Sequence, residues 1–378
     1  MKVEWHTALL LTLVAPILPI AGLLLRRSTE RRASFALAGW LTAFVLLATP
    51  SIIGFMGAYQ RFPWLTFAPF DTELWLGPLI FLYTLTLTRA VLPANWWLWL
   101  LPGVVQTLYY TACFVLLGNA EAKFAYARTI HQPFVVPVES LLAVTLAIVG
   151  VALSWRETNR YRTWLQRSYS SVTPFDLSAL RGFLSAMVAL VSVWAGLEAL
   201  QTALGRLSYL HTTFVFIGVG AAVLLLALNA LTQVHRSYPK MPPPPRPDLP
   251  TAPAAAPAVS LAALHKQVQT GGWHRDPGLT VRELARQLGS NESALSARVN
   301  AAPDVNFNQF INRIRLEEVC AALLDEGDDR TVLEIALDCG FGSKATFNRT
   351  FKEHVGMTPG QWKKQGKTSQ ITELLGFS

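Results

Sequence analysis

The sequence predicts an all-α protein in which a bundle of seven transmembrane helices is joined by a Pro/Ala-rich linker to a two-unit helix-turn-helix domain. Three observations predict this fold class: seven long apolar runs before residue 236, a Pro-rich stretch after them, and a repeated pattern in the C-terminal part. The predicted boundaries are 1–235 for the membrane part, 236–259 for the linker and 260–378 for the helix-turn-helix domain.

The composition is unusual for a soluble protein, because 52% of the residues are hydrophobic and only 15% are charged. The net positive charge arises from the first part of the chain. Before residue 258 there are 18 basic and 10 acidic residues, whereas the remainder has 14 of each sign. The net charge of +8 is therefore not by itself evidence for nucleic-acid binding.

Each apolar run is about 19 to 26 residues long, which is enough for a helix to cross the roughly 30 Å hydrocarbon core of a bilayer. The runs lie near 7–25, 33–58, 74–92, 96–118, 134–153, 182–204 and 211–234. The first run differs from a cleaved signal peptide, because it is long and is followed by an Arg cluster.

An odd number of spans places the two ends of the chain on opposite sides of the membrane. Lys and Arg are enriched in cytoplasmic loops, and one set of loops carries ten of them against five in the other set. We therefore expect the N-terminus outside and everything after residue 235 in the cytoplasm. Five of the ten lie between Arg156 and Arg181, a segment that either follows this charge rule or relays movement to the C-terminal part.

The segment 236–259 contains nine Pro residues and few side chains that could pack. This composition favours polyproline II structure, at about 3.1 Å per residue, and predicts a semi-rigid spacer. A ligand for a proline-binding partner domain is the alternative.

Two copies of one pattern lie 51 residues apart, TVRELARQLG at 280–289 and TVLEIALDCG at 331–340. In each copy, Thr followed by Glu three residues later predicts a capping box, and the final Gly suits a left-handed turn. A second helix is expected after each Gly, in SNESALSARVNAA and SKATFNRTFKEHVG. The pattern predicts two helix-turn-helix units. The segment NFNQFINRIRLEEVCAALLDEG between them predicts a long helix with Phe310, Ile314 and Val319 facing inward.

The last hundred residues resemble the DNA-binding domain of AraC/XylS-type regulators in LTVRELARQLG, FNQFINRIRLEEVCAALL and TVLEIALDCGFGSKATFNRTFKEHVGMTPGQWKK. The resemblance implies a seven-helix fold, double-stranded DNA as a partner, and transcription regulation in a bacterium, with the chain in the cytoplasmic (inner) membrane. The membrane part is similar, more loosely, to the multi-span sensory region of some family members in GPLIFLYTLTLTR and SYSSVTPFDLSALR. A homodimer and RNA polymerase are further candidate partners.

In the second predicted recognition helix, Phe347 and Phe351 lie four residues apart and are expected in the core. The base-contacting positions of the family fall on Lys344, Asn348 and Arg349. Lys and Arg donors suit guanine, and Asn suits adenine.

The first predicted recognition helix departs from the family pattern. Its candidate base contacts are Ser293, Ser296 and Arg298, and Arg298 is displaced by one position from the usual Arg. We therefore expect the second unit to dominate sequence recognition. Basic residues that are predicted to bind phosphates are Lys352, Lys363, Lys364 and Lys367.

Four polar residues toward the outer ends of the last three spans are candidates for a signal pocket, namely Glu139, Glu198, Gln201 and His211. Asp71 and Glu73 stand at the outer mouth of the third span. Ionisable groups within spans mostly face the bundle interior and mark function. Hydration at the lipid interface is the alternative, and the ligand is unknown.

Catalytic and metal-binding motifs are not recognisable. The three Cys residues lack zinc spacing, and the chain has neither a phosphate-binding Gly loop nor HExxH. We therefore expect no enzyme activity, no cofactor and no metal. The sequence predicts a membrane-anchored one-component transcription regulator, with a transporter or a membrane scaffold carrying an appended DNA-binding domain as alternatives.

Overall fold

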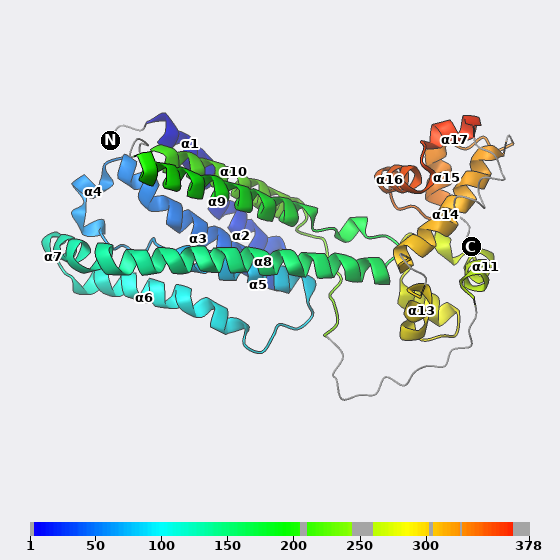
Figure 1. Ribbon diagram of the computed structural model, residues 1–378, viewed down its shortest axis with the longest axis horizontal. Coiled ribbons are helices and arrows are strands. Elements are labelled where there is room, and N and C mark those ends of the chain that lie inside the picture. Colours follow the sequence, from blue (N-terminus) through cyan, green and yellow to red (C-terminus); the bar gives the residue numbers. More distant parts are fainter. Residues whose placement is uncertain (1–3, 205–209, 244–259, 302–304, 326, 366–378) are drawn as a thin grey trace. The chain divides into compact units, whose positions relative to one another are not determined.

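The computed structural model describes residues 4–204, 210–243, 260–301, 305–325 and 327–365 (Figure 1). In this part of the chain the regular structure is helical, apart from two isolated β-bridges. The all-α prediction is confirmed there. The chain divides into two compact units: unit 1 comprises 1–159 and 177–244, and unit 2 comprises 160–176 and 245–378.

Unit 1 contains the apolar helices. In chain order they are α1 (Trp5–Val14), α2 (Ile17–Arg27), α3 (Arg31–Phe55), α4 (Ala58–Arg61), α5 (Glu73–Thr88), α6 (Leu101–Leu116), α7 (Ala120–Tyr126), α8 (Val136–Ser168), α9 (Ser178–Leu204) and α10 (Leu210–Thr232). Short helical turns are η1 (Pro63–Leu65), η2 (Trp96–Leu100) and η4 (Thr173–Phe175), and η3 (Ala127–Val135) is a π-helix that leads into α8. The last residues of α8 and the turn η4 belong to unit 2.

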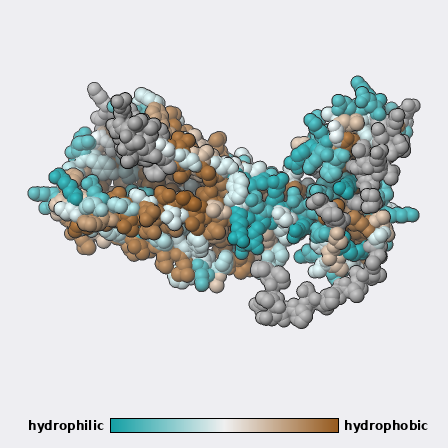
Figure 2. Space-filling model, viewed as in Figure 1, coloured by the Kyte–Doolittle hydropathy of each residue, from teal (hydrophilic) through white to brown (hydrophobic). Residues whose placement is uncertain are grey.

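Five helical stretches of the described residues have the length and apolar composition of a membrane span: Trp5–Arg27, Arg31–Phe55, Trp96–Leu116, Ala120–Ser168 and Phe214–Thr232. The apolar helices Glu73–Thr88 and Ser178–Val193 are shorter, and they overlap the third and sixth predicted spans. Large apolar side chains are exposed on the outer faces of unit 1, as the brown surface in Figure 2 shows. The count of seven spans remains a prediction.

Small residues bring α5 and α8 into close backbone contact. A Cβ atom on Gly77 would collide with the carbonyl group of Leu146, and one on Gly150 would collide with the carbonyl group of Gly77. Helix α5 also contacts α3, where the indole N–H of Trp40 donates to the carbonyl of Leu76 at 2.9 Å. Small residues at helix contacts are typical of membrane bundles.

The first residues of the Pro-rich segment are bound to unit 1. Lys240 forms an ion pair with Glu30 at 2.8 Å, and the backbone N–H of Met241 donates to the carbonyl of Thr88 at 2.8 Å. The sequence alone did not predict these contacts. The remainder of the predicted linker, 244–259, lies outside the described residues.

Unit 2 contains seven α-helices in its C-terminal described residues, as the family resemblance implied. They are α11 (Leu261–Gly271), α12 (Val281–Gln287), α13 (Glu292–Val299), α14 (Phe307–Leu324), α15 (Val332–Asp338), α16 (Lys344–Val355) and α17 (Pro359–Gln365), with the turn η5 (Trp273–Arg275) after α11.

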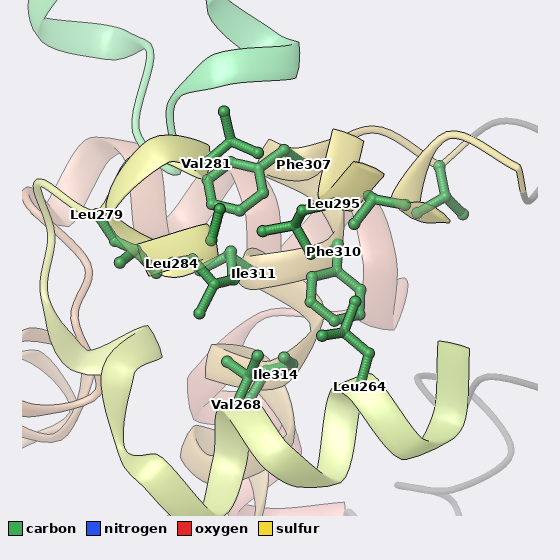
Figure 3. Packing of buried hydrophobic residues seen from close by; sticks show 13 residues of the cluster. Leu264, Val268, Leu279, Val281, Leu284, Leu295, Phe307, Phe310, Ile311 and Ile314 are labelled. Carbon is green, nitrogen blue, oxygen red and sulfur yellow. The ribbon is translucent and has the colours of Figure 1, made fainter. Parts of the chain in front are cut away.

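Helix α14 contributes to two separate hydrophobic cores. The first core gathers side chains from α11, α12, α13 and the start of α14, including Phe310 and Ile314 (Figure 3). The second gathers side chains from the end of α14 and from α15, α16 and α17, including Val319. The three inward positions predicted for the long helix are fully buried, which confirms the prediction. Because one rigid helix crosses both cores, it links the two helix-turn-helix units directly.

Candidate functional site

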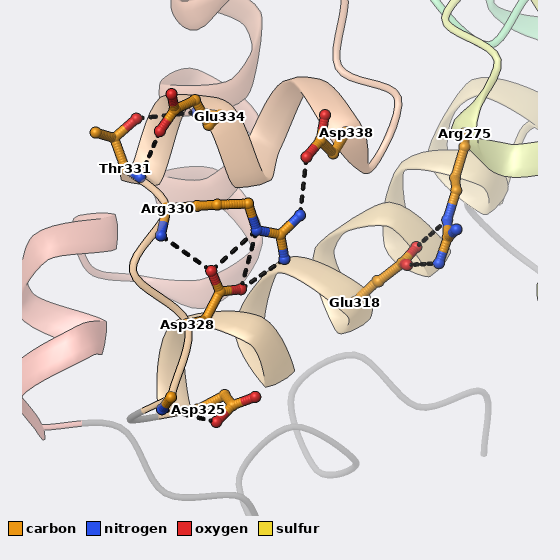
Figure 4. A network of polar contacts seen from close by, with 9 residues as sticks. Arg275, Glu318, Asp325, Asp328, Arg330, Thr331, Glu334 and Asp338 are labelled. Carbon is orange, nitrogen blue, oxygen red and sulfur yellow. Dashed lines mark hydrogen bonds and ion pairs between the residues drawn. The ribbon is translucent and has the colours of Figure 1, made fainter.

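The second helix-turn-helix unit is formed by α15 and α16. Helix α15 begins at the predicted capping box, in which Glu334 accepts a hydrogen bond from the backbone N–H of Thr331 at 2.7 Å (Figure 4). Gly340 in the turn has a φ of 95°, and a Cβ atom there would meet the carbonyl oxygen of His274 at 2.5 Å. Left-handed backbone and close approach both require Gly at this position, so the sequence fixes the turn that leads into α16.

Helix α16 buries one side and exposes the other. Phe347 and Phe351 lie in the second core, as predicted, while Lys344, Asn348 and Arg349 are exposed. Because the two Phe rings fix the rotation of the helix, the three polar side chains form one solvent-facing set of donors. Their chemistry matches acceptors on the major-groove edges of guanine and adenine.

The first unit repeats the architecture in α12 and α13. Its capping box between Thr280 and Glu283 is present, and Gly289 has a φ of 62°. Both features were predicted. At the start of α13, however, Glu292 forms an ion pair with Arg282 at 3.1 Å. A negatively charged carboxylate therefore lies at the N-terminal end of α13, where it would repel the phosphates of DNA.

The predicted base contacts on α13 are less available than those on α16. Ser293 is exposed, but Ser296 and Arg298 are half-buried. The hydroxyl of Ser296 accepts a hydrogen bond from the side-chain amide of Asn300 at 3.1 Å. These differences favour the predicted dominance of the second unit.

The candidate phosphate contacts lie on α16 and α17. Lys352, Lys363 and Lys364 are exposed. Trp362 precedes the two lysines on α17. Its ring is fully buried in the second core and holds α17 against α14. Lys367 lies outside the described residues.

Arg330, just before α15, differs from these lysines because it is paired with acidic side chains. Its guanidinium group contacts the carboxylates of Asp328 and Asp338, the latter at 2.8 Å (Figure 4). The hydrogen bonds from Arg330 lower the pKa of Asp328 to about 2. With its charge matched by two carboxylates, Arg330 is a poor candidate for phosphate binding.

Glu139, the one predicted pocket residue whose side chain is described, lies in a buried polar cluster of unit 1. It accepts hydrogen bonds from the amide of Gln106 and, at 3.0 Å, from the hydroxyl of Tyr110, both on α6. The carboxyl groups of Asp71 and Glu73 are near enough to interact electrostatically with Glu139. The cluster thus brings together Asp71 before α5, Glu73 at the start of α5, and residues of α6 and α8.

An aromatic group lies beside this cluster. The ring of His131 in η3 stacks on Tyr109, with its Nδ1 2.9 Å from the Tyr109 hydroxyl, and meets Phe67 and Tyr110 edge to face. Phe67 has a φ of 66°, an uncommon conformation for a non-Gly residue. His131 and Tyr110 were not among the site residues predicted from the sequence. The side chains of Glu198, Gln201 and His211 lie outside the described part of the chain, so the four-residue pocket stays a prediction.

No group of three or more His, Cys, Asp or Glu side chains with metal-binding geometry occurs among the described residues. The thiols of Cys320 and Cys339 are buried in the second core, and burial raises the pKa of each to about 12. Thiolates are the reactive form of cysteine, so these two side chains serve as apolar core residues.

Comparison with known proteins gives one family match and several similar transcriptional regulators. A family model described as a helix-turn-helix domain matches residues 284–365. An uncharacterised helix-turn-helix transcriptional regulator of Staphylococcus aureus (strain COL) is 39% identical over 102 residues, which are 27% of this chain and 13% of that protein. The melibiose operon regulatory protein of Escherichia coli (strain K12) is 33% identical over 97 residues, which are 26% of this chain and 32% of that protein.

The matched residues are thus less than a third of the length of each of these relatives. The match to the family model, at 284–365, lies outside the apolar helices of unit 1. No solved structure matches the chain. Geometry and similarity agree over the C-terminal helices: the matched residues 284–365 begin within α12 and include both Gly turns, α14 and the second capping box. The C-terminal part of this chain is a helix-turn-helix domain of the AraC/XylS type, the type found in transcriptional regulators.

Proposed function

We propose that the protein is a membrane-anchored one-component transcription regulator that binds specific DNA through its tandem helix-turn-helix units. The observation that carries the proposal is the exposed set Lys344, Asn348 and Arg349 on α16, opposite the buried Phe347 and Phe351. Recognition helices of this kind enter the major groove. Lys352, Lys363 and Lys364 contribute phosphate contacts in this proposal, and α13 adds weaker contacts through Ser293, Ser296 and Arg298.

The proposal places the apolar helices of unit 1 in the bacterial cytoplasmic membrane as seven spans, with the N-terminus outside and unit 2 in the cytoplasm. Five described helices with the length and composition of spans support membrane insertion. The excess of Lys and Arg in one set of loops supports the orientation. Lipid is then a permanent partner of unit 1, and dimer formation and contact with RNA polymerase are further parts of the proposal.

Signal sensing is assigned to the polar cluster around Glu139. A carboxylate bonded to Gln106 and Tyr110, with two further carboxyl groups nearby, is costly in a membrane bundle and marks a functional position. In this proposal the signal acts by changing the contacts of Glu139, with Glu198, Gln201 and His211 as additional pocket residues.

The test starts with chromatin immunoprecipitation of the full-length protein from its native cells. The recovered sites are then bound by the excised fragment 258–378 at defined salt concentrations. We expect discrete genomic peaks and binding by the fragment that prefers the recovered sites over scrambled DNA. Sequence-blind, salt-sensitive binding without peaks would contradict the proposal and would favour a transporter or a scaffold.

A further inference from the structure

The turn that follows α8, residues Tyr169–Phe175, is packed against the helix-turn-helix domain within unit 2. The backbone N–H of Ser170 donates to the carbonyl of Leu279 at 3.0 Å, and Tyr169 forms an isolated antiparallel bridge with Thr280, the capping residue of α12. Ser170 is 1% exposed. Ser170 is therefore inserted into the domain, whereas Thr173 and Pro174, later in the turn, are exposed.

Two side chains of α14 bind Ser170. Asn308 donates its amide N–H to the carbonyl of Ser170 at 2.6 Å. Arg315 donates to the hydroxyl of Ser170 at 3.1 Å and to its carbonyl at 3.4 Å. The turn thus contributes two acceptors to the central helix of the domain.

Arg315 is a buried cation that needs these acceptors. It is 1% exposed, and burial lowers its pKa to about 10 despite the opposing effect of Asp276. The backbone carbonyls of His274 and Asp276 accept two of its hydrogen bonds, each at 2.7 Å. A buried charge is costly unless its hydrogen bonds are satisfied, so Ser170 completes the hydrogen bonding of Arg315.

The same turn reaches the starts of both recognition helices. The hydroxyl of Thr173 lies 2.8 Å from that of Thr346, the third residue of α16. Tyr169 is near enough to Arg282 and Glu292 to interact electrostatically with them, and Glu292 is the first residue of α13. The N-terminal residues of a recognition helix are those that contact base edges, so DNA bound there would approach the turn closely.

We propose that residues Tyr169–Phe175 are an intramolecular ligand of the helix-turn-helix domain that competes with DNA for the N-terminal turns of α13 and α16. This inference rests on the proposed function as a DNA-binding regulator. The turn is covalently continuous with α8 and α9. A movement of these two helices withdraws the turn from Arg315 and Asn308, and the domain then becomes free to bind its operator.

The contact is tested by disulfide cross-linking in the full-length protein in membrane vesicles. The pair Thr173→Cys and Thr346→Cys is combined with a site-specific protease sequence inserted after residue 250. After mild oxidation and cleavage, we expect the C-terminal fragment to stay attached to the N-terminal fragment on a non-reducing gel. The matched control pair, Thr173→Cys with Lys364→Cys, should release it. Equal release from both pairs would overturn the proposal.

The competition is tested by operator binding of the uncleaved Thr173→Cys, Thr346→Cys protein before and after reduction. Locking the turn should weaken binding at least about tenfold, because apparent affinity scales with the binding-competent fraction, and reduction should restore it. A cross-linked protein that binds the operator as tightly as the reduced one would refute competition. Failure of the reduced and wild-type proteins to bind any recovered site would instead refute the proposed function.

A second variant changes a residue of the turn and leaves every residue of the DNA-contacting helices unchanged. Ser170→Arg places bulk and a second positive charge against Arg315, so it should expel the turn and strengthen operator binding of the full-length protein, whereas Ser170→Ala should change binding much less. Equal affinities of the Ser170→Arg and wild-type proteins would contradict the proposal.

Discussion

Trp362 on α17 donates its indole N–H to the backbone carbonyl of Cys320 on α14 at 3.2 Å, and its ring is fully buried. This contact joins the last described helix to the helix that crosses both cores. It also determines where the neighbouring lysines Lys363 and Lys364 are presented.

We expect Trp362→Ala to destabilise the second helix-turn-helix unit by about 3–5 kcal/mol, because it removes a large buried side chain and leaves a cavity. Urea unfolding of the fragment 258–378 measures the change. Leu337→Ala is the matched control, since Leu337 is 46% exposed on α15 and should shift stability by no more than about 0.5 kcal/mol. Similar losses from both variants would show that burial of Trp362 is not what stabilises the unit.

The carboxylate of Glu318 makes unit 2 sensitive to acid. Burial raises the pKa of Glu318, but hydrogen bonds from Arg275 and His274 lower it by more, so that the pKa lies below its ordinary value. Figure 4 shows the contact with Arg275. A lowered pKa stabilises the folded state above the unfolded-state pKa of about 4.3, and this stabilisation is lost as pH falls through the folded pKa.

Glu318→Gln should therefore lower the stability of fragment 258–378 at pH 7 and bring little loss below about pH 4, where the wild-type carboxylate is protonated as well. Urea midpoints at several pH values measure this. Glu353→Gln, at an exposed position on α16, serves as the control. A difference between wild type and Glu318→Gln that is independent of pH would contradict the argument.

Arg349→Ala and Arg298→Ala should differ in their effects on DNA binding. The exposed Arg349 is placed for a base contact worth about 1–3 kcal/mol of discrimination, whereas Arg298 is half-buried. We expect Arg349→Ala to abolish the preference for operator over scrambled DNA and Arg298→Ala only to weaken binding. Titration of both DNA types measures the preference, and equal losses would refute the dominance of the second unit.

Lys363→Gln should weaken binding to operator and to scrambled DNA by the same factor. It should also reduce the slope of log affinity against log salt by about 1, because one phosphate contact and its released counterion are lost. Gln365→Ala, on the same exposed helix, should leave the slope unchanged. A change in sequence preference would mean that Lys363 contacts a base.

Gly150→Ala should disrupt the packing of α5 against α8, because the added Cβ atom collides with the carbonyl of Gly77. Gly182→Ala is the matched control, since a Cβ atom on Gly182 meets nothing within 4 Å. We expect a lower thermal midpoint in detergent for Gly150→Ala alone. Equal thermal midpoints for the two variants would show that α5 and α8 can move apart with little loss of stability.

Short-range features of the helix-turn-helix domain could be predicted from the sequence. The capping boxes at Thr280 and Thr331 and the turns at Gly289 and Gly340 each involve residues only a few positions apart. The burial of Phe347 and Phe351 followed from helical periodicity in the same way. The third capping box, between Asn306 and Gln309, was missed.

Contacts between distant residues could not be predicted in this way. Nothing local to Ser170 indicates that it accepts hydrogen bonds from Arg315, 145 residues later, or that Glu139 lies between Gln106 and Tyr110. The close contact of Gly77 with Gly150 is likewise invisible in either helix alone.

The sequence by itself determined the two helix-turn-helix units, two of their capping boxes and the buried faces of α14 and α16, because these depend on backbone conformation and periodicity within one segment. The AraC/XylS type followed from the resemblance of the C-terminal motifs to that family. Only the tertiary structure decided which polar groups meet in the interior. Each buried donor or charge requires a partner, and which partner it finds depends on how separate helices pack. The turn at Ser170, the guanidinium of Arg315 and the carboxylate of Glu139 acquire their proposed roles from that packing.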